Sequence, residues 1–126
     1  MKKILFALAV ILTSLGCSKL TWIAKIYVVR AEDTASKAHA MRIDKKVPAG
    51  VRLKLYHQAC TDFLRAYRYD PSVFTLNRIE MASDTCLRVE DFKNANMFRD
   101  FEEEYVKKHP NEAKYGDAGP WMTLEG

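Results

Sequence analysis

Cysteine and histidine are the side chains in this sequence with the widest chemistry, and their spacing limits what that chemistry can be. The cysteines stand at Cys17, Cys60 and Cys86, and the histidines at His39, His57 and His109. The spacings Cys-x-x-Cys, His-x-x-x-His and Glu-x-x-His, which bring ligands together around zinc, are absent from the chain. So are a glycine-rich phosphate loop and a Gly-x-Ser-x-Gly nucleophile turn. The sequence therefore predicts no metal site, no cofactor and no catalytic residues, and it places the histidines at the surface or its boundary.

Cys17 differs from the other two cysteines because of the residues that precede it. Met1-Lys2-Lys3 is a short basic start, and residues 4–12 form an apolar run shorter than the roughly 20 residues of a permanent transmembrane helix. This layout is typical of a secretory signal. Small Gly16 then stands immediately before Cys17, where an ordinary signal peptide has an Ala-x-Ala-like site.

The stretch Thr13-Ser14-Leu15-Gly16-Cys17 resembles the lipobox of bacterial lipoproteins, with Ser14 where that family more often has leucine. The resemblance implies that Cys17 is acylated, that residues 1–16 are removed as a signal peptide, and that lipid holds the protein in a bacterial cell envelope. Ser18 follows in place of aspartate, which implies the periplasmic side of the outer membrane if the organism has two membranes. The alternatives are a plain signal peptide or an uncleaved anchor in which Cys17 is incidental.

Lipidation at Cys17 would leave Cys60 and Cys86 as an even pair in an oxidising compartment, 26 positions apart. A disulfide closing such a loop stabilises a small domain by about 3 kcal/mol. Both residues fall on expected helices, however, and free cysteines also pack well as small buried side chains. The sequence leaves both alternatives open.

Composition limits the size of the domain and its partners. Removal of residues 1–16 would leave 110 residues, enough for one domain but not for two. The formal net charge of +4 includes Lys2 and Lys3, so a mature chain would carry about +2. That bias is too weak to indicate nucleic-acid binding.

Apolar residues at helical spacing predict an all-α fold of about four helices in two antiparallel hairpins. The expected helices cover about residues 28–42, 49–67, 72–87 and 91–108. Pro48 and Pro71 stand directly before the second and third ranges, where proline suits the first position of a helix. Their apolar rows are formed by Ala31, Ala35 and Ala38; by Leu55 or Tyr56, Ala59, Phe63, Ala66 and Tyr67; by Phe74, Leu76, Ile79, Met81, Ala82, Ser83 and Cys86; and by Phe92, Ala95, Phe98, Phe101 or Glu102, and Tyr105.

Two segments flank this helical domain of residues 28–110. Residues 17–27 form a membrane-proximal lead-in with Trp22 and Ile26, which is either amphipathic beside lipid headgroups or simply the start of a core helix. Residues 111–126 contain Gly116, Gly119 and Pro120 and predict an extended tail. Trp121 and Met122 in that tail are either a local packing contact or a docking element.

Ala59, Phe63, Ala66 and Pro71 are spaced like the alanine, phenylalanine, alanine and proline of the second helix of a tetratricopeptide repeat. The helix ending at Pro110 resembles the closing helix of such a repeat more loosely. The resemblance covers residues 28–110 as two helical hairpins and implies a groove that binds peptides or partner helices.

The sequence thus predicts a lipid-anchored envelope protein that acts as a non-catalytic adaptor for another envelope protein or peptide, without a small-molecule substrate. A partner's carboxylates would be bound by Arg52, Arg65, Arg68 and Arg78. The alternatives are a structural or stress-related envelope protein without a groove-bound partner, and an enzyme whose site follows none of these motifs. A pocket in which His57 meets carboxylates would favour the enzyme.

Overall fold

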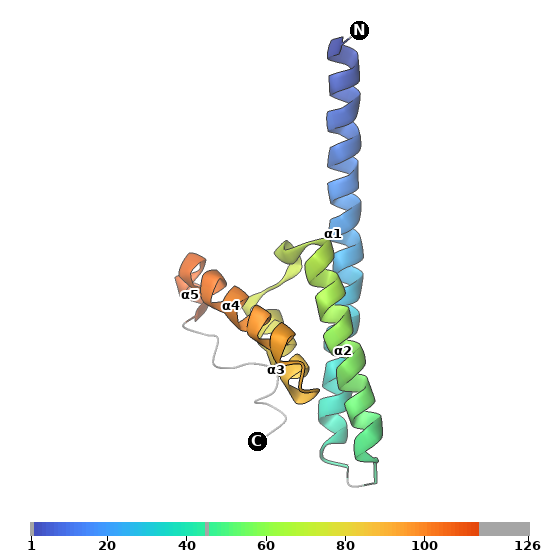
Figure 1. The fold of residues 1–126 in the computed structure, drawn as a ribbon, viewed down its shortest axis with the longest axis vertical. Coiled ribbons are helices and arrows are strands. Elements are labelled where there is room, and N and C mark those ends of the chain that lie inside the picture. The colour runs from blue at the N-terminus through green and yellow to red at the C-terminus, as the bar shows by residue number, and fades with distance from the viewer. Residues whose placement is uncertain (1, 45, 114–126) are drawn as a thin grey trace.

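The structure is a computed structural model, and it describes residues 2–44 and 46–113. Trp121 and Met122 lie outside the described residues, as do the side chains of residues 1–18. Every regular element in the described ranges is helical, which confirms the all-α prediction (Figure 1). The elements are α1 (Lys2–Met41), α2 (Ala49–Tyr69), the short 3-10 helix η1 (Pro71–Val73), α3 (Leu76–Arg88), α4 (Phe92–Lys108) and α5 (Pro110–Ala113).

The first hairpin pairs α1 with α2 along a row of small side chains. Ala24, Val28, Ala31, Ala35 and Ala38 of α1 are fully buried, in three- and four-residue steps. Because these side chains are short, the backbone of α2 can approach closely, and α1 and α2 form the most extensive helix contact of the fold. The alanine row predicted from the sequence is confirmed.

The second hairpin, α3 with α4, begins later than the sequence predicted. A helix was expected from Ser72, but Asp70 caps only the single turn η1, where its carboxylate accepts a hydrogen bond from the Ser72 amide. Phe74 is then extended, which carries its ring into the core, and Thr75 caps α3 by accepting a hydrogen bond from the Arg78 amide. Packing of the Phe74 side chain therefore interrupts the expected helix, and α3 starts only after the Thr75 cap.

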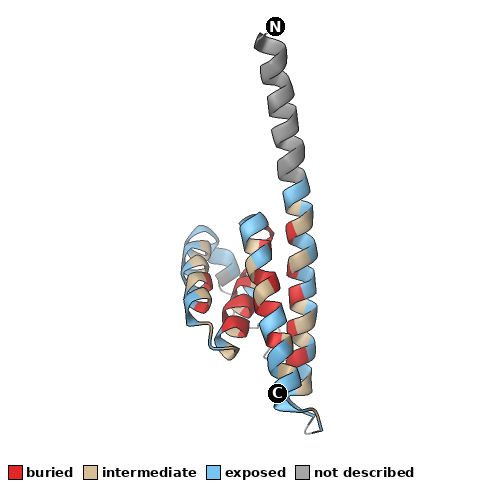
Figure 2. Ribbon diagram, turned by 45° about the vertical axis from the view of Figure 1, so that its right-hand side comes forward, coloured by how far each residue is buried: buried red, intermediate tan, exposed pale blue. Residues whose placement is uncertain are grey.

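An aromatic core joins the two hairpins. Three buried phenylalanines form its centre: Phe63 of α2, Phe74 between η1 and α3, and Phe98 of α4. The centroid of the Phe74 ring lies 6.3 Å from that of Phe63 and 5.7 Å from that of Phe98. Tyr67 and Phe101 close the cluster edge-on at 5.3 Å. In Figure 2 the buried residues accordingly face inward between the helices. Phe92, expected on the inner face of α4, is instead 58% exposed, because it is the first residue of the helix and lies beyond the core.

The packed domain starts earlier than residue 28. The Thr21 hydroxyl donates a hydrogen bond to the Asp70 carboxylate, and the Tyr27 ring stacks on Tyr69 at 5.8 Å. Hydrogen bonds from Thr21 and Ser72 lower the pKa of Asp70. Residues 17–27 thus belong to the continuous helix α1 and are not a separate segment.

Two further expectations are corrected, and one open alternative is decided. Trp22 and Ile26 are exposed, which excludes the alternative that they are core residues of α1, whose buried side at this level is formed by Ala24 and Val28. His39 is buried (2% exposed), although His57 and His109 are exposed as predicted. Residues 110–113, assigned in part to the tail, form the helical turn α5. Within the described residues, no helix is long and apolar enough to cross a membrane.

Candidate functional site

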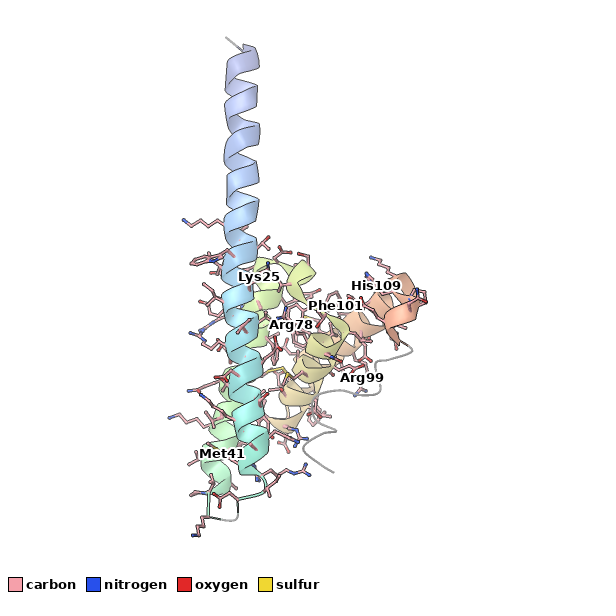
Figure 3. All side chains as sticks on the ribbon, turned by 180° about the vertical axis from the view of Figure 1, so that it is seen from behind. Lys25, Met41, Arg78, Arg99, Phe101 and His109 are labelled. Carbon is pink, nitrogen blue, oxygen red and sulfur yellow. A yellow bond between two sulfur atoms is a disulfide. The ribbon has the colours of Figure 1, made fainter. Side chains whose placement is uncertain are left out.

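The four arginines proposed as partner contacts do not form one site. Arg78 ion-pairs with Glu32 and donates a hydrogen bond to the Val73 carbonyl oxygen at 2.7 Å, so it joins α3 to α1 and η1 (Figure 3). Arg65 and Arg68 are exposed near the C-terminal end of α2, whereas Arg52 lies in its first turns. The structure therefore gives Arg78 a structural contact and separates Arg52 from Arg65 and Arg68 by most of the length of α2.

Arg65 belongs to a charged cluster that the sequence did not reveal. Asp62, whose side chain is 8% exposed, accepts two 2.8 Å hydrogen bonds from the Arg30 guanidinium and lies 3.5 Å from Arg65. The Tyr27 ring lies beneath both guanidiniums, at 5.1 and 5.7 Å. The hydrogen bond to Asp62, followed by its charge, raises the pKa of Arg30. This cluster stabilises the α1–α2 contact, since its members come from both helices.

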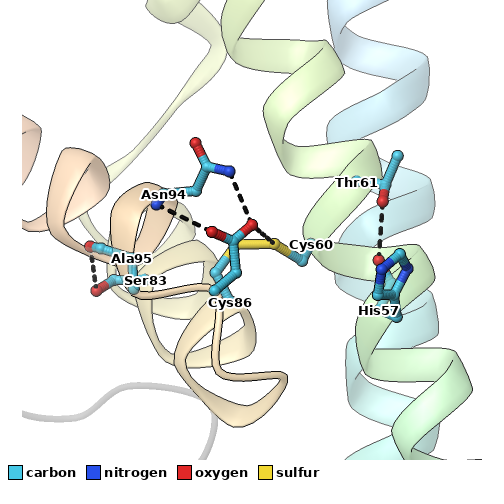
Figure 4. The surroundings of a disulfide bond; sticks show 8 residues. His57, Cys60, Thr61, Ser83, Cys86, Asn94 and Ala95 are labelled. Atoms are coloured by element: carbon cyan, nitrogen blue, oxygen red, sulfur yellow. Dashed lines mark hydrogen bonds between the residues drawn. A yellow bond between two sulfur atoms is a disulfide. The ribbon is translucent and has the colours of Figure 1, made fainter.

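Cys60 and Cys86 form a disulfide that joins α2 to α3 (Figure 4). Both cysteines are buried. Asp91, the residue that caps α4, accepts hydrogen bonds from the Asn94 amide at 3.2 Å and side chain at 2.7 Å, and its Oδ2 lies 3.9 Å from Sγ of Cys60. The disulfide therefore lies where α2, α3 and the start of α4 meet.

A groove opens beside this junction, between the N-terminal half of α2 and the α3–α4 corner. We call it the corner groove. It encloses about 660 Å³ and is lined by Gly50, Leu53, Lys54, His57 and Gln58 from α2 and by Arg88, Val89 and Glu90 from the corner. Its volume lies within the ordinary range of binding pockets. Its apolar side chains, with Lys54, Arg88 and one carboxylate around them, fit an amphipathic segment with acidic residues.

The wall of the corner groove is held in place by Arg88. Its guanidinium donates a 2.8 Å hydrogen bond to Asp84 one turn earlier and lies 5.3 Å from the centroid of the Tyr56 ring. Burial raises the pKa of Tyr56, while the charge of Arg88 acts in the opposite direction. Arg88 thus contacts both helices that form the groove and fixes their separation.

Glu90 has an unusual backbone conformation at the mouth of the groove. Its φ is 61°, the only positive value at a non-glycine residue in the described ranges. The Asp91 amide donates a hydrogen bond to the Cys86 carbonyl oxygen at 3.0 Å, and the Glu90 amide donates one to the Leu87 carbonyl oxygen. These two bonds end α3 in a motif that usually has glycine where Glu90 stands. A glutamate here costs roughly 1–2 kcal/mol of backbone strain relative to an ordinary conformation. The groove therefore carries a carboxylate at a strained backbone position.

His57 does not form a catalytic pair with a carboxylate in this arrangement. It lines the corner groove with Glu90, and it also lines a polar hollow of about 430 Å³ that contains Asp62. The Asp62 carboxylate is bonded to Arg30 and Arg65 and not to the His57 ring, so it does not orient that ring as a base here. Within residues 2–44 and 46–113, no three His, Cys, Asp or Glu side chains are grouped so as to hold a metal ion.

Comparisons with protein-family models, curated proteins and solved structures gave no match for this chain. The function must therefore be inferred from the residues and their geometry. Sequence reasoning missed the corner groove because its walls are 30 or more positions apart along the chain. Its one local signal was the exposed Leu53, which lies outside the apolar row of α2.

Proposed function

We propose that this chain is a lipoprotein of the bacterial cell envelope, acylated at Cys17, whose helical domain binds an acidic amphipathic segment of another envelope protein. The tetratricopeptide-like character of the two hairpins is part of the same proposal. The observation that carries the anchoring is the sequence Leu15-Gly16-Cys17 at the end of a short apolar run with a basic start.

Two features of the structure support the proposal. The Cys60–Cys86 disulfide suits an oxidising compartment such as the periplasm, where such bonds persist. The corner groove offers apolar and basic side chains on a rigid corner formed by three helices, and the disulfide and Arg88 hold that corner together. A preformed groove loses little conformational entropy on binding, which favours recognition of a partner segment.

The anchor is tested by expressing the full chain in a Gram-negative bacterium and measuring the intact mass of the purified membrane form. The expected mass corresponds to residues 17–126 plus diacylglyceryl and acyl groups on Cys17. The variant Cys17→Ser should retain residues 1–16 and carry no lipid, whereas the neighbouring control Ser18→Ala should be lipidated. Retention of residues 1–16 by the unaltered chain, or a mass without acyl groups, would refute the anchoring.

The binding role is tested by chemical crosslinking in native membranes of the source bacterium, followed by mass spectrometry. We expect a recurrent envelope protein joined to Lys54, whose amine lies at the groove. An equal yield of crosslinks from Lys54 and from exposed lysines outside the groove, such as Lys37 and Lys107, would contradict a groove-bound partner.

A further inference from the structure

The side of α1 that faces away from the other helices carries a stripe of large apolar side chains. Trp22, Ile26 and Val29 are 64%, 46% and 55% exposed, and they follow one another at four- and three-residue steps. We call them the outer stripe. Because a helix turns 100° per residue, this stripe lies opposite the buried Ala24, Val28 and Ala31. Figure 3 shows the side chains of α1 near Lys25 projecting away from the rest of the fold.

The charge beside the outer stripe is positive. Lys19 and Lys25 are exposed on the same part of α1. The carboxylate nearest to them on this face, Asp33, is bonded to Lys37 at 3.2 Å. The other cation along the stripe, Arg30, is bonded to Asp62. A surface of tryptophan, aliphatic side chains and lysines matches a layer of anionic lipid headgroups over their acyl chains.

The domain also begins very close to Cys17. Thr21 is already held by Asp70, so Ser18, Lys19 and Leu20 alone lie between the acylation position and the packed fold. A tether this short restricts the domain to a few orientations at the bilayer surface. An upright helix would place Val29 about 18 Å above Cys17, beyond a headgroup layer of about 5–8 Å.

We propose that the outer stripe lies against the headgroup layer, with α1 along the membrane surface and Lys19 and Lys25 on anionic lipids. This inference rests on the acylation of Cys17 proposed above. It makes the outer side of α1 a second lipid-binding surface besides the anchor. The corner groove, which is lined by α2, by Arg88 of α3 and by the following residues Val89 and Glu90, shares no residue with this lipid-binding surface.

A second copy of the chain is the less favourable occupant of the outer stripe. Two copies anchored in one leaflet with upright α1 helices would pair these helices in parallel. Lys19 would then face Lys19, and Lys25 would face Lys25, and such like-charge contacts are unfavourable. Anionic lipid brings the opposite charge to the same surface.

Tryptophan fluorescence tests the inference, since the chain has only two tryptophans, Trp22 and Trp121. The full chain with Trp121→Phe is purified as the lipidated form and reconstituted into phosphatidylethanolamine–phosphatidylglycerol vesicles, with its acyl mass checked first. We expect Trp22 emission to shift to shorter wavelength and to lose most of its quenching by aqueous iodide. Lipids brominated near the headgroup should quench it. In a second protein with Trp22→Phe, Trp121→Phe and Val29→Trp, the tryptophan at position 29 should show the same emission shift and the same protection from iodide if α1 lies along the surface.

Charge reversal supplies the matched variants. Lys19→Glu with Lys25→Glu should restore iodide quenching of Trp22, since each lysine near an anionic surface contributes about fivefold to binding. Lys54→Glu, at the corner groove, should leave the quenching unchanged. Equal effects of the two changes would contradict a specific role for Lys19 and Lys25.

The outcomes separate this inference from the proposed anchor. Full iodide quenching of Trp22 in a chain that carries its acyl groups would overturn the inference and leave the anchor intact. Absence of the acyl mass would refute the anchor. A second copy would be the occupant if two results came together: Trp22 lost its protection from iodide when the protein was diluted in lipid, and an Ile26→Cys variant formed disulfide-linked dimers. These results would also overturn the inference.

Discussion

Asp62 shows how the fold changes the meaning of a charged residue. The sequence suggested arginines as partner contacts, yet one of them, Arg65, is bonded together with Arg30 by an aspartate with an 8% exposed side chain. Arg78 was expected to meet a partner, but its own Glu32, 46 positions away, already bonds it. Residue type predicts which bond a side chain can form, whereas the partner depends on distant parts of the chain.

Replacing Asp62 should therefore affect stability through the α1–α2 contact. Asp62→Ala removes two charge-assisted hydrogen bonds to Arg30 and should lower the free energy of unfolding by about 2 kcal/mol, as measured by urea denaturation. Arg30 is half exposed and regains water, so the loss is smaller than for a fully buried pair. The control Asp33→Ala breaks an exposed pair with Lys37 and should change stability by less than about 0.5 kcal/mol. Equal effects of the two changes would show that the cluster is not structural.

At the scale of elements, the disulfide strengthens the contact between the two hairpins. The α2–α3 contact is less extensive than either the α1–α2 or the α3–α4 contact. The bond between Cys60 and Cys86 spans this junction and closes a loop of 26 positions. Cys60→Ala with Cys86→Ala should lower the free energy of unfolding by about 3 kcal/mol, mainly because the unfolded chain gains freedom.

The measurement compares urea midpoints of the disulfide-bonded protein, the reduced protein and the double-alanine variant. Reduction and substitution should lower the midpoint similarly. A midpoint that reduction leaves unchanged would show that the two hairpins associate without help from the disulfide.

Elements were predicted well where the signal is local. The buried rows of α2 and α3 follow from helical spacing, and α4 begins within one residue of its predicted start. The predicted start of α3 at Ser72 was wrong, because the packing of Phe74 determines where this helix begins. The sequence left open whether Trp22 and Ile26 face the core or the outside, because α1 buries its small side chains and exposes its large ones, which hydrophobicity alone does not reveal. The corner groove depends on how α2 meets the α3–α4 corner, which spacing along one helix cannot reveal.

At the scale of the whole molecule, the two surfaces left for partners lie on different parts of the fold. The outer stripe belongs to α1 alone, whereas the corner groove is formed by α2 and the α3–α4 corner. A lipid layer on the outer stripe would cover none of the residues that line the groove. The short connection between Cys17 and Thr21 would hold the stripe near the bilayer, because only three residues separate the two.

The partner should therefore be lost when the groove is altered and retained when other exposed apolar side chains are altered. Leu53→Asp replaces one of the two aliphatic side chains of the groove with a carboxylate and should reduce the crosslinked partner by about tenfold or more, since an acidic segment would meet a like charge, which costs at least about 1.4 kcal/mol. Ile43→Asp is the matched control, because Ile43 is also exposed (67%) but follows α1, away from the groove lining. Both variants should keep their helical circular dichroism, as neither side chain is buried. If Ile43→Asp reduced the partner as strongly as Leu53→Asp, or if neither did, the partner would bind elsewhere on the domain.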